Sequence, residues 1–148
     1  MKEYLSLSPD KRQGITEKIK TILFGEKEIV FAFIFGSFLD APSFRDIDIG
    51  IYLDNMKEDE IFDYELKISK NIADECSLPF DIFEVKILNF ASISFLNNIF
   101  SRGQLIFSKN HQLLSDMIEN TSLDTIANEY VASQSLKELV PDSIQEKI

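Results

Sequence analysis

Two short motifs in the first half of the chain contain the residue types that could do chemistry. An apolar run, Ile29 to Phe35, leads into Gly36-Ser37, and after eight intervening residues the chain reads Asp46-Ile47-Asp48. On a β-strand, residues at i and i+2 lie on the same face, so the two carboxylates would point the same way. Two like charges held that close repel each other and usually need a cation between them.

The Gly36-Ser37 turn could bind an anion. Glycine allows the backbone to approach a ligand closely, and neighbouring N–H groups and a hydroxyl can contact phosphate oxygens. Together with the carboxylates, this turn supplies the parts of a metal-dependent nucleotide site. A solvated strand edge is the alternative for an isolated Asp-x-Asp. An EF-hand is excluded, because Ile47 and Ile49 are apolar and Gly50 stands at the wrong offset.

Composition restricts the classes of protein. A chain of 148 residues with 45% apolar and 27% charged residues is typical of one globular domain, residues 1–148. The net charge of −10 argues against general nucleic-acid binding, which needs clustered Lys and Arg. No apolar run reaches the roughly 20 residues of a membrane span, and Met1-Lys2-Glu3-Tyr4 does not open a signal peptide. The single cysteine, Cys76, excludes an internal disulfide and is expected to be packed and inert. We expect a cytoplasmic protein.

Hydrophobic periodicity predicts alternating helices and strands. Helices are expected over residues 9–24, 58–76, 91–102 and 111–139, the last interrupted near Asn120-Thr121, and strands over 28–36, 46–54, 79–88 and 104–108. Ser8 and Pro9 are typical of a helix start, and Gly25 of a helix end. Residues 37–45 are expected to form a loop, and the tail from Pro141 is polar. The order predicts an α+β domain with a small mixed sheet of about four strands.

The arrangement of strand, Gly-Ser, loop and Asp-x-Asp resembles the nucleotidyltransferases of the DNA polymerase β-like superfamily. It is most similar to their small stand-alone members, the minimal nucleotidyltransferase (MNT) proteins. The resemblance covers about residues 28–109, followed by a C-terminal helical extension over about 111–140. It rests on Phe35-Gly36-Ser37, Asp46-Ile47-Asp48-Ile49, Phe80-Asp81-Ile82-Phe83 and the stretch from Phe100 to Phe107.

The resemblance implies a role for each matching residue. Asp46 and Asp48 would bind two Mg²⁺ ions, and Asp81, on a neighbouring strand, would be the third carboxylate, binding one ion and helping to deprotonate the acceptor hydroxyl. Gly36 and Ser37 would hold the triphosphate of ATP. Glu84 is an alternative third carboxylate, although on a regular strand it points to the opposite face from Asp81. His111 is expected at the surface.

The loop after Gly36-Ser37 departs from the family pattern. Family members commonly place a basic residue and a glycine there, whereas this loop reads Phe38-Leu39-Asp40-Ala41-Pro42-Ser43-Phe44-Arg45. Arg45 could neutralise phosphate instead, or could pair with Asp40. The departure affects the expected affinity for the triphosphate and leaves the metal site untouched.

The resemblance implies a Mg²⁺-dependent transfer of AMP from ATP to a protein hydroxyl. Stand-alone MNT proteins often act as antitoxins of HEPN-domain ribonucleases, so a HEPN protein is the expected partner, and self-association is left open. One alternative is an antitoxin that acts by contact alone. Another is a small-molecule transferase similar to the aminoglycoside enzymes, which normally need a further substrate-binding domain.

Overall fold

In the computed structural model, residues 3–139 are described, with side chains described to residue 134. The elements in chain order are α1 (Pro9–Phe24), β1 (Ile29–Phe35), α2 (Ser37–Asp40), β2 (Ile47–Leu53), the 3-10 turn η1 (Glu58–Glu60), α3 (Ile61–Cys76), the 3-10 turn η2 (Phe80–Ile82), β3 (Phe83–Ile87), α4 (Ile93–Arg102), β4 (Gln104–Ser108) and α5 (His111–Leu139). The predicted α+β class is confirmed. The expected polar tail from Pro141 lies outside the described residues.

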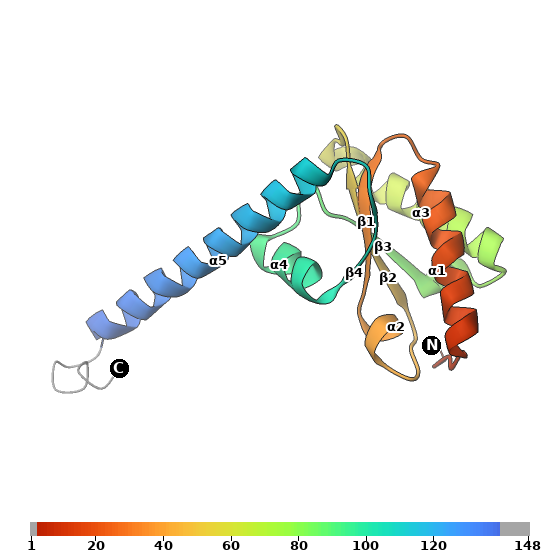
Figure 1. Ribbon diagram of the computed structural model, residues 1–148, viewed down its shortest axis with the longest axis horizontal. Helices are drawn as coiled ribbons and strands as arrows, with labels where there is room; N and C mark the ends of the chain where they lie inside the picture. The colour runs from red at the N-terminus through yellow and green to blue at the C-terminus, as the bar shows by residue number, and fades with distance from the viewer. Residues whose placement is uncertain (1–2, 140–148) are drawn as a thin grey trace.

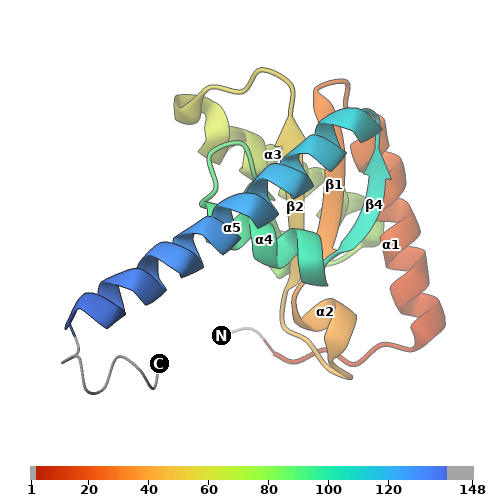
Figure 2. The ribbon, with the colours of Figure 1, turned by 60° about the vertical axis from the view of Figure 1, so that its left-hand side comes forward.

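The four strands form one mixed sheet in the order β3-β2-β1-β4. β1 is antiparallel to both β2 and β4, whereas β2 and β3 are parallel. Helices α1 and α3 cover one face of the sheet, and α4 with the first part of α5 covers the other (Figure 1). Figure 2 shows α5 crossing in front of the sheet and continuing beyond it. Within residues 3–139, no helix is both long and apolar enough to cross a membrane.

Alternating strand residues divide between two apolar clusters. The face toward α1 and α3 buries the β2 residues Ile47, Ile49 and Ile51, which pack with Ile19 and Ile68 of the helices. The face toward α4 and α5 buries Phe31, Phe33, Leu88, Ile99 and Leu114. Burying one such side chain contributes about 1.5–3 kcal/mol, so the two clusters hold the sheet rigidly between its helices.

Strand pairing aligns residues in rows across the second face. Phe31 pairs with Tyr52, and their rings stack at 5.1 Å in the apolar part of the sheet. In a row nearer the end of β1, Phe35 lies beside Asp48, and Asp48 lies beside Glu84 of β3. The same face is therefore an apolar core at one end and carries carboxylates at the other.

Several local predictions are confirmed, including the start of α1. Ser8 caps the helix by accepting a hydrogen bond from the N–H of Lys11 at 3.3 Å, and Gly25 ends it. Cys76, the last residue of α3, is half-buried, and burial raises the pKa of its thiol. His111, the first residue of α5, is exposed as expected.

Three details of the prediction are wrong. α5 runs without interruption through Asn120-Thr121, because Thr121 is buried and the helix continues on both sides of it. The loop over 37–45 begins with a helical turn, α2. The third strand starts at Phe83 instead of residue 79, because Pro79 is followed by a 3-10 turn in which Ile82 donates to the carbonyl of Pro79 at 3.2 Å.

Candidate active site

Asp48 and Glu84 face each other across the parallel β2–β3 pair. They are register partners, so their side chains leave the sheet on the same face. Asp46 directly precedes β2, and its negative charge raises the pKa of Asp48. All three side chains are half-buried. The structure thus brings a third carboxylate to the Asp-x-Asp motif, and that carboxylate is Glu84.

The pKa of Asp48 is affected by the two neighbouring carboxylates. Burial, a hydrogen bond with Glu84 and the negative charges of Glu84 and Asp46 together raise the pKa of Asp48 from 3.8 to about 7, while Lys86 acts in the opposite direction. Near neutral pH, Asp48 is therefore poised between its protonated and ionised forms. A cation at this position would favour the ionised form.

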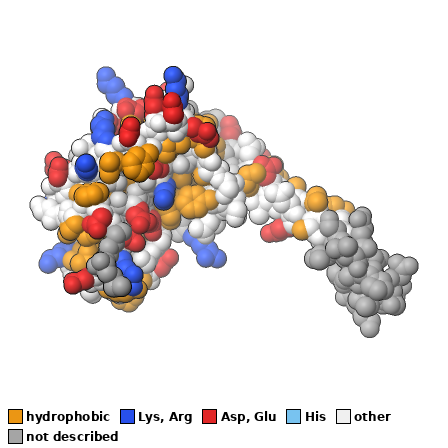
Figure 3. Space-filling view, turned by 180° about the vertical axis from the view of Figure 1, so that it is seen from behind, with side chains coloured by type: hydrophobic (Ala, Val, Ile, Leu, Met, Phe, Trp, Pro, Cys, Tyr) orange, Lys and Arg blue, Asp and Glu red, His pale blue; other side chains and the backbone are white. Residues whose placement is uncertain are grey.

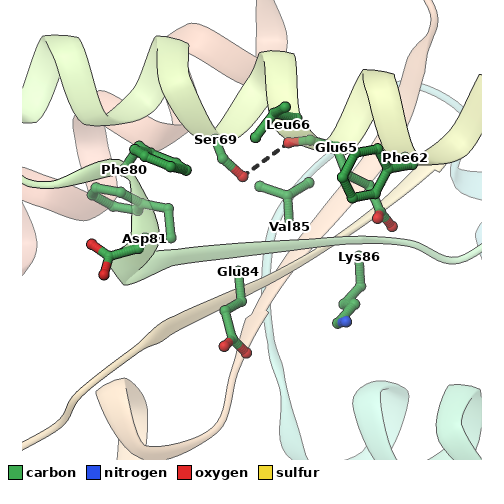
Figure 4. A pocket seen from close by; sticks show the side chains of 10 residues that line it. Phe62, Glu65, Leu66, Ser69, Phe80, Asp81, Glu84, Val85 and Lys86 are labelled. Atoms are coloured by element: carbon green, nitrogen blue, oxygen red, sulfur yellow. Dashed lines mark hydrogen bonds between the residues drawn. The ribbon is translucent and has the colours of Figure 1, made fainter. Parts of the chain in front are cut away.

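Asp81 lies within η2 and is exposed to solvent. It lines a hollow of about 230 Å³ between α3 and β3, and the lining also includes Phe80, Glu84 and Lys86. Figure 4 shows Glu84 and Lys86 pointing to the side of β3 opposite to Val85. The expectation that Asp81 sits on a strand is wrong. The comparison of Glu84, the alternative third carboxylate, with Asp81 assumes a regular strand, and the alternation of faces does not extend backward through the 3-10 turn.

Gly36 is required at the end of β1. Its φ of 82° lies in the region that favours glycine, and a Cβ at this position would collide with Oδ2 of Asp48. The absent side chain therefore leaves the backbone of Gly36 in contact range of the carboxylate. Ser37 follows as the first residue of α2 and is exposed, so its hydroxyl is accessible beside the acidic cluster.

Two aromatic side chains and one arginine hold the loop after Ser37. Phe38 and Phe44 are buried and meet edge to face, with ring centroids 4.9 Å apart. The guanidinium of Arg12, on α1, donates to the carbonyls of Phe38 and Pro42 at 2.6 Å each and to that of Leu7 at 3.3 Å. It also lies over both rings, 5.5 Å from Phe38 and 5.0 Å from Phe44. The loop is thus fastened to the domain by Arg12.

Arg45 directly precedes Asp46 and contacts the N-terminal segment. Its guanidinium lies over the ring of Tyr4, 4.5 Å from the centroid. The neighbouring Phe44 exchanges two backbone hydrogen bonds with Leu5, of 2.7 and 2.9 Å, which keeps the N-terminal segment against this loop. The contact that the structure shows for Arg45 is therefore with Tyr4.

Lys86 supplies a positive charge on the carboxylate face. It is two residues beyond Glu84 on β3 and is exposed. Its register partner on β2 is Gly50, which has no side chain to stand in the way. Phe35 and Phe95 also meet on this face, edge to face at 5.7 Å, and both are half-buried. Lysine and aromatic side chains are the types that contact phosphate and nucleobase.

The donor set fits magnesium in its chemistry. Asp46, Asp48 and Glu84 offer hard carboxylate oxygens, the ligands that Mg²⁺ prefers. Among residues 3–139, no three or more His, Cys, Asp and Glu side chains are already gathered at the spacing of a metal centre.

Comparison with known proteins identifies the family. The family model described as Polymerase beta, Nucleotidyltransferase matches residues 17–112, more than half of the chain. The chain therefore belongs to this nucleotidyltransferase family. No curated protein matches it.

Solved structures share the fold at low sequence identity. A complex of a tri-AMPylated HEPN toxin of Shewanella oneidensis with MNT antitoxin matches at a TM-score of 0.60 and 16% identity, over 86% of this chain and 96% of that one. The toxin–antitoxin MntA–HepT matches at 0.59 and 15%, over 85% and 96%. A toxin–antitoxin structure with AMP-PNP matches at 0.60 and 16%, over 83% and 95%. The predicted polymerase β-like nucleotidyltransferase fold is thereby confirmed.

Sequence reasoning missed two residues that the structure places at or behind the site. Lys86 follows Glu84 by two residues, so the two side chains share a face of β3. This spacing could have identified Lys86 if the parallel pairing of β3 with β2 had been known. Arg12 lies on a helix far from the motif in sequence, and no local pattern connects it to the loop.

Proposed function

We propose that this protein is a Mg²⁺-dependent nucleotidyltransferase that transfers AMP from ATP to a hydroxyl group of a partner protein. We further propose that the partner is a HEPN ribonuclease toxin, encoded alongside this chain, and that the transfer makes this chain its antitoxin. The observation that carries the proposal is the pairing of Asp48 with Glu84, beside Asp46 and Gly36-Ser37. Cytoplasm, where ATP is available, is the proposed place of action.

The reaction follows from the residues. The acceptor hydroxyl oxygen attacks the α-phosphorus of ATP, the bond from that phosphorus to the bridging oxygen breaks, and pyrophosphate leaves. Glu84 would take the hydroxyl proton, a role that its pairing with Asp48 supports. Asp46, Asp48 and Glu84 would hold two Mg²⁺ ions, which when bound neutralise phosphate charge and orient the reacting oxygens. Gly36, Ser37 and Lys86 would contact the triphosphate.

Family membership and the related structures support this proposal in different ways. The family defines nucleotidyl transfer as the reaction class. The related structures contain a tri-AMPylated HEPN toxin with MNT antitoxin in one case and AMP-PNP in another, which makes AMP, ATP and a HEPN partner the natural first assignment. Asp81, which the sequence resemblance implicates, and Arg45, which could neutralise phosphate in place of the family's basic residue, remain proposals with a weaker geometric basis than Glu84 and Lys86.

The test is transfer of label from ATP. The chain is incubated with [α-³²P]ATP, Mg²⁺ and the ribonuclease encoded alongside it, and we expect label on the ribonuclease that disappears with Asp48→Asn. Asp74→Asn, an exposed carboxylate change on α3, is the matched control and should keep full transfer. Label found on a small molecule instead would favour the antibiotic-type transferase.

A second candidate, inhibition by contact alone, is favoured by one observation. The loop over 38–45 has neither the glycine nor a free basic group expected near a triphosphate, since Arg45 lies on Tyr4. If the unlabelled ribonuclease stays inhibited by both wild type and Asp48→Asn, contact inhibition replaces the enzymatic function.

A further inference from the structure

The distal part of α5 presents apolar side chains to solvent. Four of the twelve large apolar side chains that are strongly exposed in the described part of the chain fall within residues 123–131. They are Leu123, Ile126, Tyr130 and Val131, with 56 to 64% of each side chain exposed. In Figure 1 this part of α5 projects beyond the rest of the domain, and Figure 3 shows hydrophobic side chains along it.

Helical geometry places these side chains on the face opposite to the domain. Leu114 and Thr121 are the buried residues of α5, and at 100° per residue they share one side of the helix. Leu123 and Tyr130 lie about 160–180° from Thr121, and Ile126 lies about 140° from it. We call Leu123, Ile126 and Tyr130 the outer stripe. Folding of the domain leaves this stripe without a partner among residues 3–134.

The charges around the outer stripe are all negative. Between residues 111 and 134, the charged side chains of α5 are Asp116, Glu119, Asp124 and Glu129, with no Lys or Arg. Asp116 and Glu119 continue the line of the stripe toward the start of the helix, and Glu129 borders it about 60° from Ile126. Asp124 lies outside the stripe, about 60° from the buried Thr121. The whole chain has a net charge of −10, so its overall field has the same sign.

The negative charges on α5 indicate which kind of partner could bind the outer stripe. In a pair of these helices, residues 111–134 of each copy would bring four carboxylates and no Lys or Arg, which disfavours a second copy. A membrane surface is disfavoured as well, since interfacial helices carry Lys and Arg on their polar face. An apolar groove rimmed by Lys and Arg complements both the outer stripe and its acidic border.

We propose that the outer stripe of α5 is the docking surface for a protein partner whose groove is apolar and rimmed with basic residues. The identity of this partner rests on the proposed function: it is the ribonuclease that receives AMP. A ribonuclease needs basic residues on its surface to bind RNA. Helix α5 then holds the substrate protein, while the carboxylate site on the sheet acts on it. Tyr130 and Ile126 are the expected anchors, because large apolar side chains dominate binding at such surfaces.

The test measures binding separately from transfer. The full chain is titrated into the ribonuclease by calorimetry without ATP, using wild type, Ile126→Asp and Asn128→Asp. Asn128 is exposed on the opposite side of the same turns, so its variant adds the same charge outside the outer stripe. We expect Ile126→Asp to weaken binding at least about tenfold, and Asn128→Asp to change it less than about twofold. Circular dichroism checks that both remain helical.

The rim is tested by charge reversal and salt. Glu119→Lys should weaken binding, because Glu119 is exposed in line with the stripe, and wild-type binding should weaken as salt is raised, because exposed charge pairs are screened. Binding that is unchanged by Ile126→Asp, by Glu119→Lys and by salt would overturn the proposal, as would failure of wild type to bind. Self-association of wild type that Ile126→Asp abolishes would assign the stripe to a second copy. If Ile126→Asp loses binding while wild type transfers no label, the docking surface stands and the proposed reaction falls.

Discussion

Asp48 of β2 and Glu84 of β3 are register partners in the parallel part of the sheet, and they hold two carboxyl groups side by side on the face that α4 partly covers. This relationship joins a motif at residues 46–48 to a residue that the sequence motif does not contain. Burial raises the pKa of Asp48, and the hydrogen bond and negative charge of Glu84 raise it further.

Removing the charge of Asp48 should stabilise the metal-free protein and abolish transfer. Asp48→Asn keeps the shape of the side chain and removes its repulsion from Glu84 and Asp46. Discounted for its partial exposure to water, the expected gain is about 1–2 kcal/mol in the free energy of unfolding, measured by urea denaturation at pH 8 with EDTA. Asp74→Asn should leave stability unchanged. A destabilised Asp48→Asn would show that the carboxylate is a structural partner instead.

The same pair predicts how the stability of the metal-free protein depends on pH. The folded-state pKa of Asp48 is about 7, above its ordinary 3.8, so between these values the folded state holds a proton that the unfolded state has released. The contribution of Asp48 to stability is therefore fully present below about pH 4 and is lost as pH rises through about 7. The difference in stability between wild type and Asp48→Asn should grow over this window. A difference independent of pH would contradict the assignment.

Glu84 and Asp81 compete for the role of third carboxylate. We expect Glu84→Gln to lower the rate of AMP transfer at least about 100-fold, because it removes a group at the reacting centre. Asp81→Asn should lower it less than about threefold, because that side chain is exposed on η2. Single-turnover transfer with labelled ATP measures both. The reverse order of effects would restore the role that the family resemblance implies for Asp81.

Arg12 should matter for the loop beside Gly36-Ser37. Arg12→Met removes three hydrogen bonds to carbonyls and two ring contacts. We expect a loss of about 2–3 kcal/mol in the free energy of unfolding and faster amide hydrogen exchange over residues 38–44. Lys11→Met, its exposed neighbour, is the control. Unchanged exchange in the loop would show that the two aromatic side chains hold it without Arg12.

Lys86 is expected to contribute to the affinity for ATP. Lys86→Met should raise the dissociation constant of Mg²⁺-ATP about tenfold with little effect on stability, because the side chain is exposed. Equilibrium binding of a fluorescent ATP analogue measures this, with Lys70→Met on α3 as the control for net charge. A tenfold loss with Arg45→Met and none with Lys86→Met would return the phosphate contact to Arg45.

The sequence alone was sufficient for the parts of the fold that local chemistry determines. Ser8 and Pro9 begin a helix by capping, the apolar run into Phe35 makes a buried strand, and Gly36 allows the positive φ and close backbone approach that follow. Each of these depends on residues within one turn or one strand. Asp46 and Asp48 are also close for a local reason, because they stand two residues apart where β2 begins.

Only the tertiary structure decided the partners of this motif. The choice between Asp81 and Glu84 depends on where β3 begins, and the turn after Pro79 removes Asp81 from the strand. The register of β3 against β2, which places Glu84 beside Asp48, follows from packing of the whole sheet against α3. Sequence periodicity determined which residues share a face of one strand. Contacts between segments far apart in the chain determined which strands share a site.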